Sequence, residues 1–252
     1  MFAGACRGPA SGRIGGGHRN VAWSGIGMVA NRKRRGGPSK SVAPPADLAA
    51  GAVGELWSDD LPEAARALLT SAVLCFSRKG FHATTTRDIT AAIGLSPGAL
   101  YVHFPSKEGV LFEIVRTGHE RALEAIRAQR DDGDTRAYVG RLVAGLVAWH
   151  ARHHTVARVC QYELAGLGPE HRAAVRELRR RFTAVLRSAV TRGAREGVFD
   201  VPDVNRSVRA IVSLGIDLVR WYSIEGADSP EVLAGYYADL ALRMLGTDAA
   251  AR

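Results

Sequence analysis

Apolar residues recur at steps of three and four positions along most of the chain from residue 62 onward, and this is the repeat of an amphipathic helix. The first such stripe consists of Ala65, Leu68, Leu69, Ala72, Cys75 and Phe76. Gly80 follows this stripe and suits the left-handed residue that ends many helices. No stretch alternates apolar and polar residues convincingly, as a strand would. The pattern therefore predicts an all-α protein.

Two short helices are predicted in the stretch that follows. Thr85 and Asp88 have the spacing of a capping box, in which each side chain bonds the backbone N–H of the other residue, so the first short helix should begin there. Gly94 allows a sharp turn after it. Ser96 should then cap the second short helix, with Pro97 at its first position, where a missing N–H costs nothing.

Longer helices should fill the rest of the chain. Ser106 is placed to cap one that carries Leu111, Ile114, Val115 and Ala122. Further helices are predicted at Tyr138–His153, Glu170–Glu196, Asp203–Ile224 and Pro230–Leu245. The last two have more apolar positions than one buried face needs, so we expect a second copy of the chain to cover them, which would make a homodimer.

The pair of short helices favours a DNA-binding element. Helices shorter than about twelve residues are marginal in water unless they pack on something larger. Two of them joined by a short turn that contains glycine are typical of a helix-turn-helix, whose second helix enters the major groove of double-stranded DNA. Gly98 and Ala99 are small enough to let the backbone of that second helix approach the bases.

Positive charge is concentrated at the start of the chain. Residues 1–46 carry eight Lys or Arg residues and no acidic ones, whereas the remainder is nearly balanced, within a formal net charge of +9. This composition predicts a disordered basic tail over residues 1–57, and a second disordered tail over 248–252. Within the first, the run NRKRR (31–35) is either a solvated cluster or an arm that follows the DNA backbone.

The cellular compartment follows from the cysteines and the hydropathy. Three cysteines without a spacing pattern favour a reducing compartment, so we expect a cytoplasmic protein. No apolar run approaches the roughly 18 residues that a membrane-spanning helix needs.

The stretch FSRKGFHATTTRDITAAIGLSPGALYVHFPSKEGVL resembles the DNA-binding domain of the TetR family of bacterial regulators. The resemblance implies a helix-turn-helix domain over residues 58–111 and a helical ligand-binding and dimerisation domain over 112–247. It also implies a homodimeric repressor that a small molecule releases from a palindromic operator.

The residues that would contact DNA divide into two groups. By the resemblance, phosphates would be held by Thr85, Tyr101, His103 and Lys107, and base edges would be met by Thr86, Pro97, Gly98 and Ala99. Thr84 and Ser96 add hydroxyl groups suited to phosphate oxygens. The second short helix lacks Arg, Asn and Gln, so specificity should depend on thymine methyl groups, Arg87 and DNA shape.

A ligand pocket is expected among the helices from Tyr138 to Tyr222. Its predicted lining is Leu146, Trp149, His150, Tyr162, Phe182, Leu186, Leu214 and Trp221. A ligand there would move the helix from Ser106 to Ala128 as a lever and weaken operator binding. The stretches HHTVARVCQYELAGL, REGVFD and VRWYSIEGADSPEVLAGYYADLALRML resemble TetR-type repressors that sense acyl-CoA thioesters. An acyl-CoA and an unknown hydrophobic drug or metabolite both remain open as the ligand.

Histidines, arginines and known catalytic motifs bear on three other kinds of site, for a metal ion, an anionic ligand and catalysis. His150 and His154 stand four apart on one predicted helix, but no cysteine or carboxylate completes a metal site, so polar lining of a pocket is preferred and neither a metal nor a cofactor is expected. Five arginines of one helix form either a solvated face or a rim for an anionic ligand such as coenzyme A: Arg172, Arg176, Arg179, Arg180 and Arg181. Without a P-loop, GxSxG or HExxH motif, no enzyme is predicted. A ligand-independent architectural DNA-binding protein is the alternative function.

Overall fold

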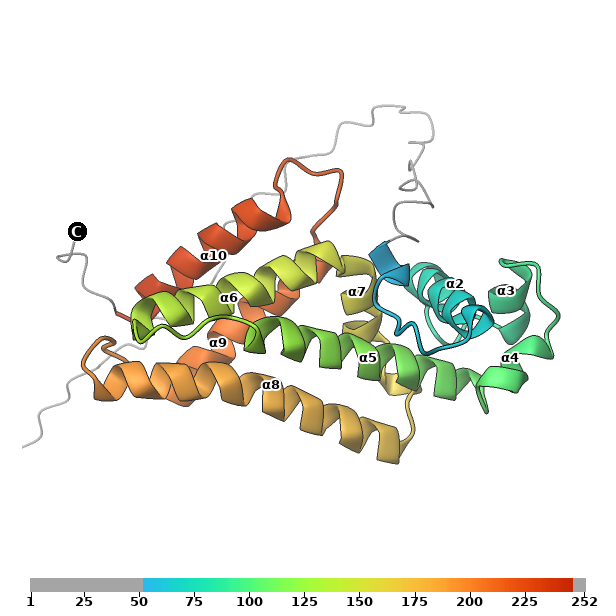
Figure 1. Ribbon diagram of the computed structural model, residues 1–252, viewed down its shortest axis with the longest axis horizontal. Coiled ribbons are helices and arrows are strands. Elements are labelled where there is room, and N and C mark those ends of the chain that lie inside the picture. Colours follow the sequence, from blue (N-terminus) through green and yellow to red (C-terminus); the bar gives the residue numbers. More distant parts are fainter. Residues whose placement is uncertain (1–51, 247–252) are drawn as a thin grey trace, which may run out of the picture. The chain divides into compact units, whose positions relative to one another are not determined.

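The computed structural model describes residues 52–246, which are helical with no strand among them (Figure 1). The helices are α2 (Glu63–Lys79), α3 (Thr86–Ala91), α4 (Ala99–His103), α5 (Lys107–Arg127), α6 (Thr135–Arg152), α7 (His154–Tyr162), α8 (Pro169–Arg195), α9 (Val204–Asp217) and α10 (Pro230–Met244). Short 3₁₀ turns lie at Leu164–Gly166 and Leu218–Arg220. The predicted all-α fold is confirmed.

The two predicted tails lie mostly outside the described residues, as does the basic run at 31–35. Only residues 52–57 of the longer tail are described, and these are folded. Val53, Leu56 and Trp57 are buried, and Trp57 Nε1 donates a hydrogen bond of 2.8 Å to Thr70 Oγ1. The prediction of disorder was therefore wrong for residues 52–57, because large apolar side chains fix this segment to the core.

Of the three helix caps predicted in the helix-turn-helix stretch and at the start of the next helix, two are present in the structure. The capping box of Thr85 and Asp88 is present at α3. The Ser106 side chain accepts a hydrogen bond of 2.9 Å from Gly109 N at the start of α5. The predicted cap at Ser96 is wrong, since α4 begins later, at Ala99. There the Ala99 N–H donates to the Ser96 carbonyl, and a backbone turn takes the place of a hydroxyl cap.

The later helices differ from the prediction at their ends. α6 begins at Thr135, earlier than predicted, because Asp134 caps it by accepting a hydrogen bond of 2.9 Å from Ala137 N. α7 was not predicted at all: the chain leaves the helical conformation at His153, with φ −107° and ψ 31°, and a new helix follows. α9 ends at Asp217 and continues only as a 3₁₀ turn.

Helix α5 connects the helix-turn-helix to the rest of the described chain (Figure 1). It packs against α2, α6, α7 and α8, and Val110, Leu111, Ile114 and Val115 are fully buried along it. The expected boundary between residues 111 and 112 falls inside this helix, and residues 52–246 belong to one compact unit. The two predicted domains therefore share α5.

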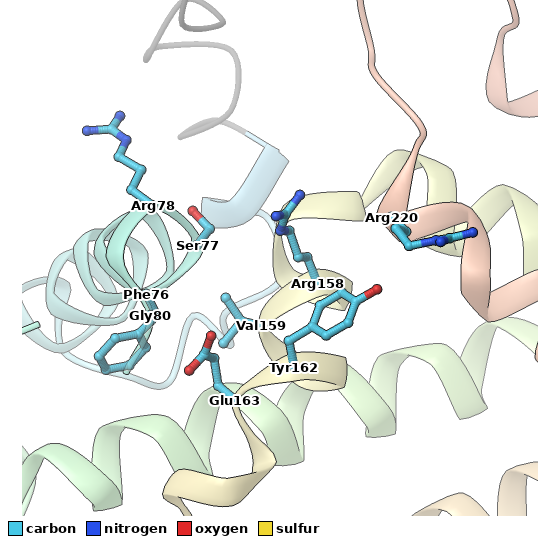
Figure 2. A pocket seen from close by; sticks show the side chains of 9 residues that line it. All are labelled: Phe76, Ser77, Arg78, Gly80, Arg158, Val159, Tyr162, Glu163 and Arg220. Atoms are coloured by element: carbon cyan, nitrogen blue, oxygen red, sulfur yellow. The ribbon is translucent and has the colours of Figure 1, made fainter. Parts of the chain in front are cut away.

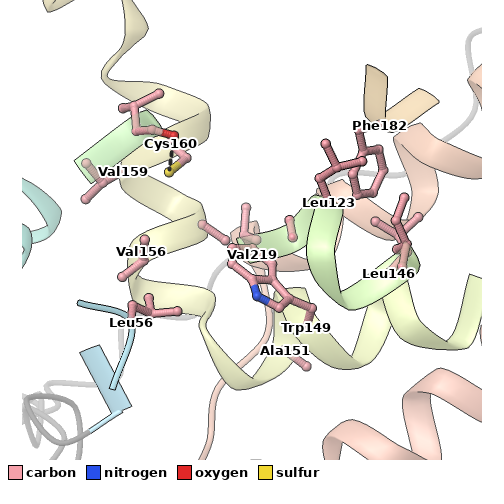
Figure 3. Packing of buried hydrophobic residues seen from close by; sticks show 14 of the residues in the cluster. Leu56, Leu123, Leu146, Trp149, Ala151, Val156, Val159, Cys160, Phe182 and Val219 are labelled. Carbon is pink, nitrogen blue, oxygen red and sulfur yellow. Dashed lines mark hydrogen bonds between the residues drawn. The ribbon is translucent and has the colours of Figure 1, made fainter. Parts of the chain in front are cut away.

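Gly118 marks the closest approach of α5 to α7. A Cβ atom built on Gly118 would lie 2.7 Å from Cys160 Sγ and 3.3 Å from Val156 Cγ1. Side chains do not tolerate the first of these separations, so glycine lets the two helices meet. Cys160 is itself buried in the apolar cluster that joins α5, α6, α7 and α8 (Figure 3).

Within residues 52–246, none of the helices combines the length and the apolarity that crossing a membrane requires.

Candidate functional site

Helices α3 and α4 are held on α2 by buried contacts. Ile89 of α3 and Leu100 of α4 are fully buried, and Ser71 of α2 donates a hydrogen bond of 2.7 Å to the Ile89 carbonyl. Gly94 has a φ of +70°, which glycine adopts without strain. The chain can therefore reverse direction within the short segment 92–98 that joins α3 to α4.

Most side chains predicted to meet DNA remain accessible on this element. The exposed ones are Thr85, Arg87, Ser96, Pro97, Gly98 and Tyr101, while Thr86, Ala99 and His103 are half-buried. Tyr101 keeps 56% of its surface exposed, although it stands next to the fully buried Leu100. The structure thus leaves one face of α3 and α4 free for a partner, and contact with DNA stays a prediction.

Val102 is a candidate that sequence reasoning did not single out. It exposes 79% of its surface, more than any other exposed large apolar residue in the described part of the chain. It lies between Tyr101 and His103 on α4, the helix expected in the major groove. An apolar residue outside the buried stripe of that helix was the signal available in the sequence, because the methyl group of thymine is an apolar target.

Thr84 does not belong to the exposed face, and its prediction as a phosphate contact was wrong. Its side chain is fully buried, and Thr84 Oγ1 donates a hydrogen bond of 2.8 Å to the Gly80 carbonyl. The hydroxyl therefore closes the loop between α2 and α3.

Lys107 was also predicted to hold a phosphate, and the structure gives it a different task. Lys107 Nζ donates hydrogen bonds to the carbonyl oxygens of Thr84, at 2.6 Å, and Phe81, at 2.8 Å. It also lies 4.3 Å from the centroid of the Phe81 ring, a cation–π distance. The ammonium group is directed into the α2–α3 loop and positions the start of α3.

The polar groups at the start of α3 are likewise occupied. Thr85 Oγ1 donates to Asp88 Oδ2 at 2.9 Å and accepts from Asp88 N at 3.1 Å, while Lys79 Nζ donates to Asp88 Oδ1 at 3.2 Å. The hydrogen bonds from Thr85 and Lys79 lower the pKa of Asp88 to about 2. A phosphate oxygen near Thr85 would have to displace Asp88 to receive the hydroxyl proton.

A cavity of about 190 Å³ lies among helices α5 to α9. Its apolar wall comes from Gly118, Ala122, Trp149, Ala157, Phe182, Val212 and Ile216, and its polar groups are His119, His150, Cys160, Gln161, Arg179 and Thr183. Figure 3 shows Trp149 and Phe182 as part of the surrounding apolar cluster. This hollow can hold a small, largely apolar molecule.

Three of the predicted pocket residues line that cavity, namely Trp149, His150 and Phe182. The predicted lining was wrong for the others. Leu146 and Leu186 are buried in the core and do not reach the cavity, and a Cβ on Gly215 would meet Leu146 at 2.8 Å. Tyr162, Leu214 and Trp221 do not line this cavity, and they are 50%, 41% and 49% exposed.

The histidines of the cavity are neutral at physiological pH. Burial lowers the pKa of both His119 and His150 to about 4. His119 Nδ1 lies 2.7 Å from the Val115 carbonyl, so Nδ1 carries the proton and Nε2 accepts a hydrogen bond from Arg179 Nε at 3.1 Å. His150 Nδ1 lies 2.8 Å from the Leu146 carbonyl, which leaves His150 Nε2 as an acceptor.

The predicted pairing of His150 with His154 on one helix is wrong, because the helix breaks between them at His153. Among residues 52–246, no group of three or more His, Cys, Asp or Glu side chains is arranged to hold a metal ion.

A second hollow, of about 300 Å³, lies between α2 and α7 (Figure 2). Tyr162 lines this one, together with Arg158, Arg220 and Glu163. Glu163 Oε2 accepts a hydrogen bond of 2.8 Å from Phe81 N, so the end of α7 holds the same loop that Lys107 holds from α5. A Cβ on Gly166 would lie 2.5 Å from the Phe81 ring, which shows how closely this segment packs on the loop.

The chain matches two profiles of known families. Residues 68–114 match the bacterial regulatory proteins of the tetR family, and residues 132–245 match a tetracyclin repressor-like C-terminal domain. Both profiles describe transcriptional regulators, in line with the prediction that the protein is not an enzyme.

Relatives and solved structures give the same result. The chain is 30% identical over 203 residues to the HTH-type transcriptional repressor KstR2 of Rhodococcus jostii, an alignment that covers 79% of this chain and 95% of the relative. A regulatory protein of the tetR family from Rhodococcus RHA1 is 40% identical, with a TM-score of 0.71 over 75% of this chain and 100% of that structure. AibR, solved with isovaleryl coenzyme A and operator DNA, shares the fold at 21% identity, with a TM-score of 0.64 over 73% of this chain and 98% of AibR.

Proposed function

Because the chain belongs to the TetR family of bacterial transcriptional regulators, we propose that it is a cytoplasmic, homodimeric repressor that a small apolar effector releases from a palindromic operator. The observation that carries this proposal is that an accessible α3–α4 face is held on α2, while an apolar cavity is lined in part by α5 and α7, two helices that pack against α2.

DNA recognition relies on α4 and the start of α3. Tyr101 supplies a hydroxyl for a phosphate, and Val102 supplies an apolar surface for thymine methyl groups. Arg87, exposed on α3, pairs with no carboxylate of residues 52–246, whereas Lys107, which is nearer in sequence, is held by the Phe81 and Thr84 carbonyls. Since α4 has no side chain for a bidentate base contact, sequence-dependent DNA shape contributes much of the selectivity.

Dimerisation covers apolar side chains that remain exposed near the end of the described chain. These are Leu214, Trp221, Ile224, Val232, Tyr236 and Met244, on or next to α9 and α10. A soluble protein rarely leaves so many large apolar residues exposed without a partner. A twofold pair would also present two α4 helices at the spacing of about 34–36 Å that successive major grooves require.

The effector signal passes through α7 to the loop before α3. Cys160 and Gln161 of α7 line the cavity, and Glu163, which directly follows this helix, holds Phe81 N. A ligand that prefers a shifted α7 therefore also prefers a shifted loop, and operator affinity falls by at most the ligand's differential affinity for the two states.

Acyl-CoA thioesters are the first effectors to test. They are supported by the resemblance of the C-terminal stretches to acyl-CoA-responsive repressors, and AibR was solved with isovaleryl coenzyme A. The cavity volume of about 190 Å³ is below the usual range for sites that enclose whole drug-sized ligands, so it suits an acyl chain with the nucleotide outside.

Genomic footprinting with the purified protein tests the proposal and supplies the operator. We expect a short palindrome near promoters, bound by a dimer and released by an apolar metabolite. Tyr101→Ala should weaken operator binding at least about tenfold without changing the dimer, since it removes a hydrogen bond to a charged phosphate worth roughly 1.5–3 kcal/mol. Tyr236→Ala is the matched exposed tyrosine, and it should shift the monomer–dimer equilibrium seen by sedimentation.

Binding without palindrome preference, unaffected by any metabolite, would contradict the proposal. That result would favour the architectural DNA-binding protein.

A further inference from the structure

Arg179 of α8 is a half-buried cation that has only neutral partners. Its Nε donates to His119 Nε2 at 3.1 Å, and its terminal nitrogen donates to Gln161 Oε1 at 2.9 Å and to the Cys160 carbonyl at 3.3 Å. No carboxylate in the described part of the chain pairs with it. Burial lowers the pKa of the Arg179 guanidinium, as expected for a cation that has lost water without gaining a counter-ion.

Other arginines of α8 and its neighbours form ion pairs. Arg180, the next residue, pairs with Glu177 on the surface. Arg192, near the end of the same helix, pairs with Asp131 at 2.7 Å. Arg176 and Arg181 are exposed, so water solvates their charge, whereas Arg179 is half-buried with hydrogen bonds to neutral groups alone. Arg179 therefore differs from these neighbours, although the sequence shows only a run of similar arginines.

The cavity next to Arg179 offers no negative charge to it. The titratable groups of the lining are His119, His150 and Cys160, and burial keeps all three neutral, since it also raises the pKa of Cys160 to about 12. The rest of the lining is neutral and mainly apolar, with Trp149 and Phe182 as its aromatic members. Taken alone, the cavity is an apolar hollow with one positive group on its wall.

A buried charge is costly unless an opposite charge and hydrogen bonds compensate it, and a guanidinium matches the geometry of a carboxylate or phosphate. We propose that the effector of this protein carries an anionic group that binds Arg179, with its apolar body in the cavity between Trp149 and Phe182. This inference rests on the proposed function for the role of the ligand as effector, but not for binding itself. His150 Nε2 supplies an acceptor for a hydroxyl or amide group on the same ligand.

Calorimetric titration of the full-length protein with matched probes tests this inference. Octanoate presents an apolar chain with a carboxylate, and octanol presents the same chain without a charge. Octanoyl-CoA presents the chain with the phosphates of coenzyme A, and coenzyme A alone presents the phosphates without the chain. We expect octanoate or octanoyl-CoA to bind at least about tenfold more tightly than octanol, because a charge-assisted hydrogen bond is worth more than a neutral one.

The variants identify the group that recognises the anion. Arg179→Gln should weaken binding of the anionic probe about tenfold or more and leave octanol binding unchanged, whereas Arg179→Lys should restore part of it. Arg180→Gln removes an adjacent, ion-paired arginine and should change nothing. If Arg179→Gln weakens the binding of octanoate alone, the site recognises a carboxylate. If it weakens the binding of the two CoA probes alone, the site recognises a phosphate.

Two results would overturn the inference. The Arg179→Gln variant could bind the anionic probes as tightly as the wild-type protein does, or the wild-type protein could bind no anionic probe saturably. Operator binding is measured separately. Anion binding that depends on Arg179 but does not release DNA would leave this inference intact and reject the effector role. Release of DNA by uncharged compounds alone would support the proposed function and reject this inference.

Discussion

The helix-turn-helix and the cavity use their polar groups in opposite ways. In the former, Lys107, Thr84 and Asp88 are bound within the chain, to backbone carbonyls or to a capping partner. In the latter, the Arg179 guanidinium meets only neutral acceptors, and His150 Nε2 has no recorded partner among residues 52–246. The first region is built to keep its shape, and the second keeps a charge and an acceptor for a molecule that is not part of the chain.

Replacing Lys107, which fixes the shape of the helix-turn-helix, should have the largest effect on stability of the changes predicted here. Lys107→Met removes two charge-assisted hydrogen bonds, to the Thr84 and Phe81 carbonyls, and leaves the latter with only its bond from Thr84 N. The free energy of unfolding should therefore fall by about 3 kcal/mol, and operator binding should weaken with it. Urea unfolding measures the first quantity. Lys79→Met, which removes an exposed ion pair to Asp88, is the control and should cost about 1 kcal/mol or less.

The salt dependence of operator binding separates the two roles considered for Lys107. A phosphate contact would contribute about 0.9 to the slope of log K against log salt concentration, and its removal would flatten that slope. A residue that positions the loop leaves the slope unchanged in any Lys107→Met protein that still folds. A flattened slope with unaltered stability would restore the phosphate role.

Acidification comes next, because the effect expected from each buried histidine of the cavity is smaller than that of replacing Lys107. His119 and His150 have a folded-state pKa of about 4 against 6.5 for the free side chain, so the unfolded chain binds more protons below pH 6.5. Stability is therefore fully present above pH 6.5 and is lost as the pH falls towards 4, by about 2 kcal/mol per histidine at pH 5. Urea unfolding at several pH values measures the loss.

His150→Gln should make that pH dependence shallower, because one of the buried histidines no longer titrates; burial also lowers the pKa of His153 and His154, so part of the dependence remains. His82→Gln, at an exposed position, serves as the control and should keep the wild-type dependence. If the dependence persists in full in the first variant, His150 is not the buried neutral group that the structure indicates.

The hydrogen bond between the two regions gives the smallest of these effects. Glu163→Ala removes the acceptor of Phe81 N, so amide exchange in residues 81–86 should become roughly tenfold faster, as for the loss of one hydrogen bond of about 1.4 kcal/mol. Hydrogen exchange followed by mass spectrometry measures it. Glu163→Gln retains an acceptor oxygen and should exchange more slowly than the alanine variant; equal rates in all three proteins would rule out α7 as the support of this loop.

The sequence predicted the helix-turn-helix better than the cavity, because its signals are local. The capping box of Thr85 and Asp88 and the turn at Gly94 each depend on residues within a few positions of one another. The role of Lys107 could not be predicted, since its partners are backbone carbonyls more than twenty residues away. The break at His153 contains neither glycine nor proline and leaves no clear mark in the sequence.

Periodicity identified apolar residues of the C-terminal helices but not the neighbours that cover them. Trp149 and Phe182 line the cavity, whereas Leu214 and Trp221 share the same apolar character and are exposed. Arg179 could not be told apart from the arginines beside it, because only the packing of α8 on α5, α6 and α9 decides which guanidinium is half-buried.

The close contact between Gly118 and Cys160 has a consequence for the evolution and engineering of ligand preference. Both residues line the cavity, and a methyl group added at one must be compensated by atoms lost at the other. A paired exchange, Gly118→Ala with Cys160→Ala, would move bulk from the α7 side of this contact to the adjoining α5 side at nearly constant total volume. A duplicated copy of this regulator could thus change which molecular outline it accepts while its operator-reading surface stays the same.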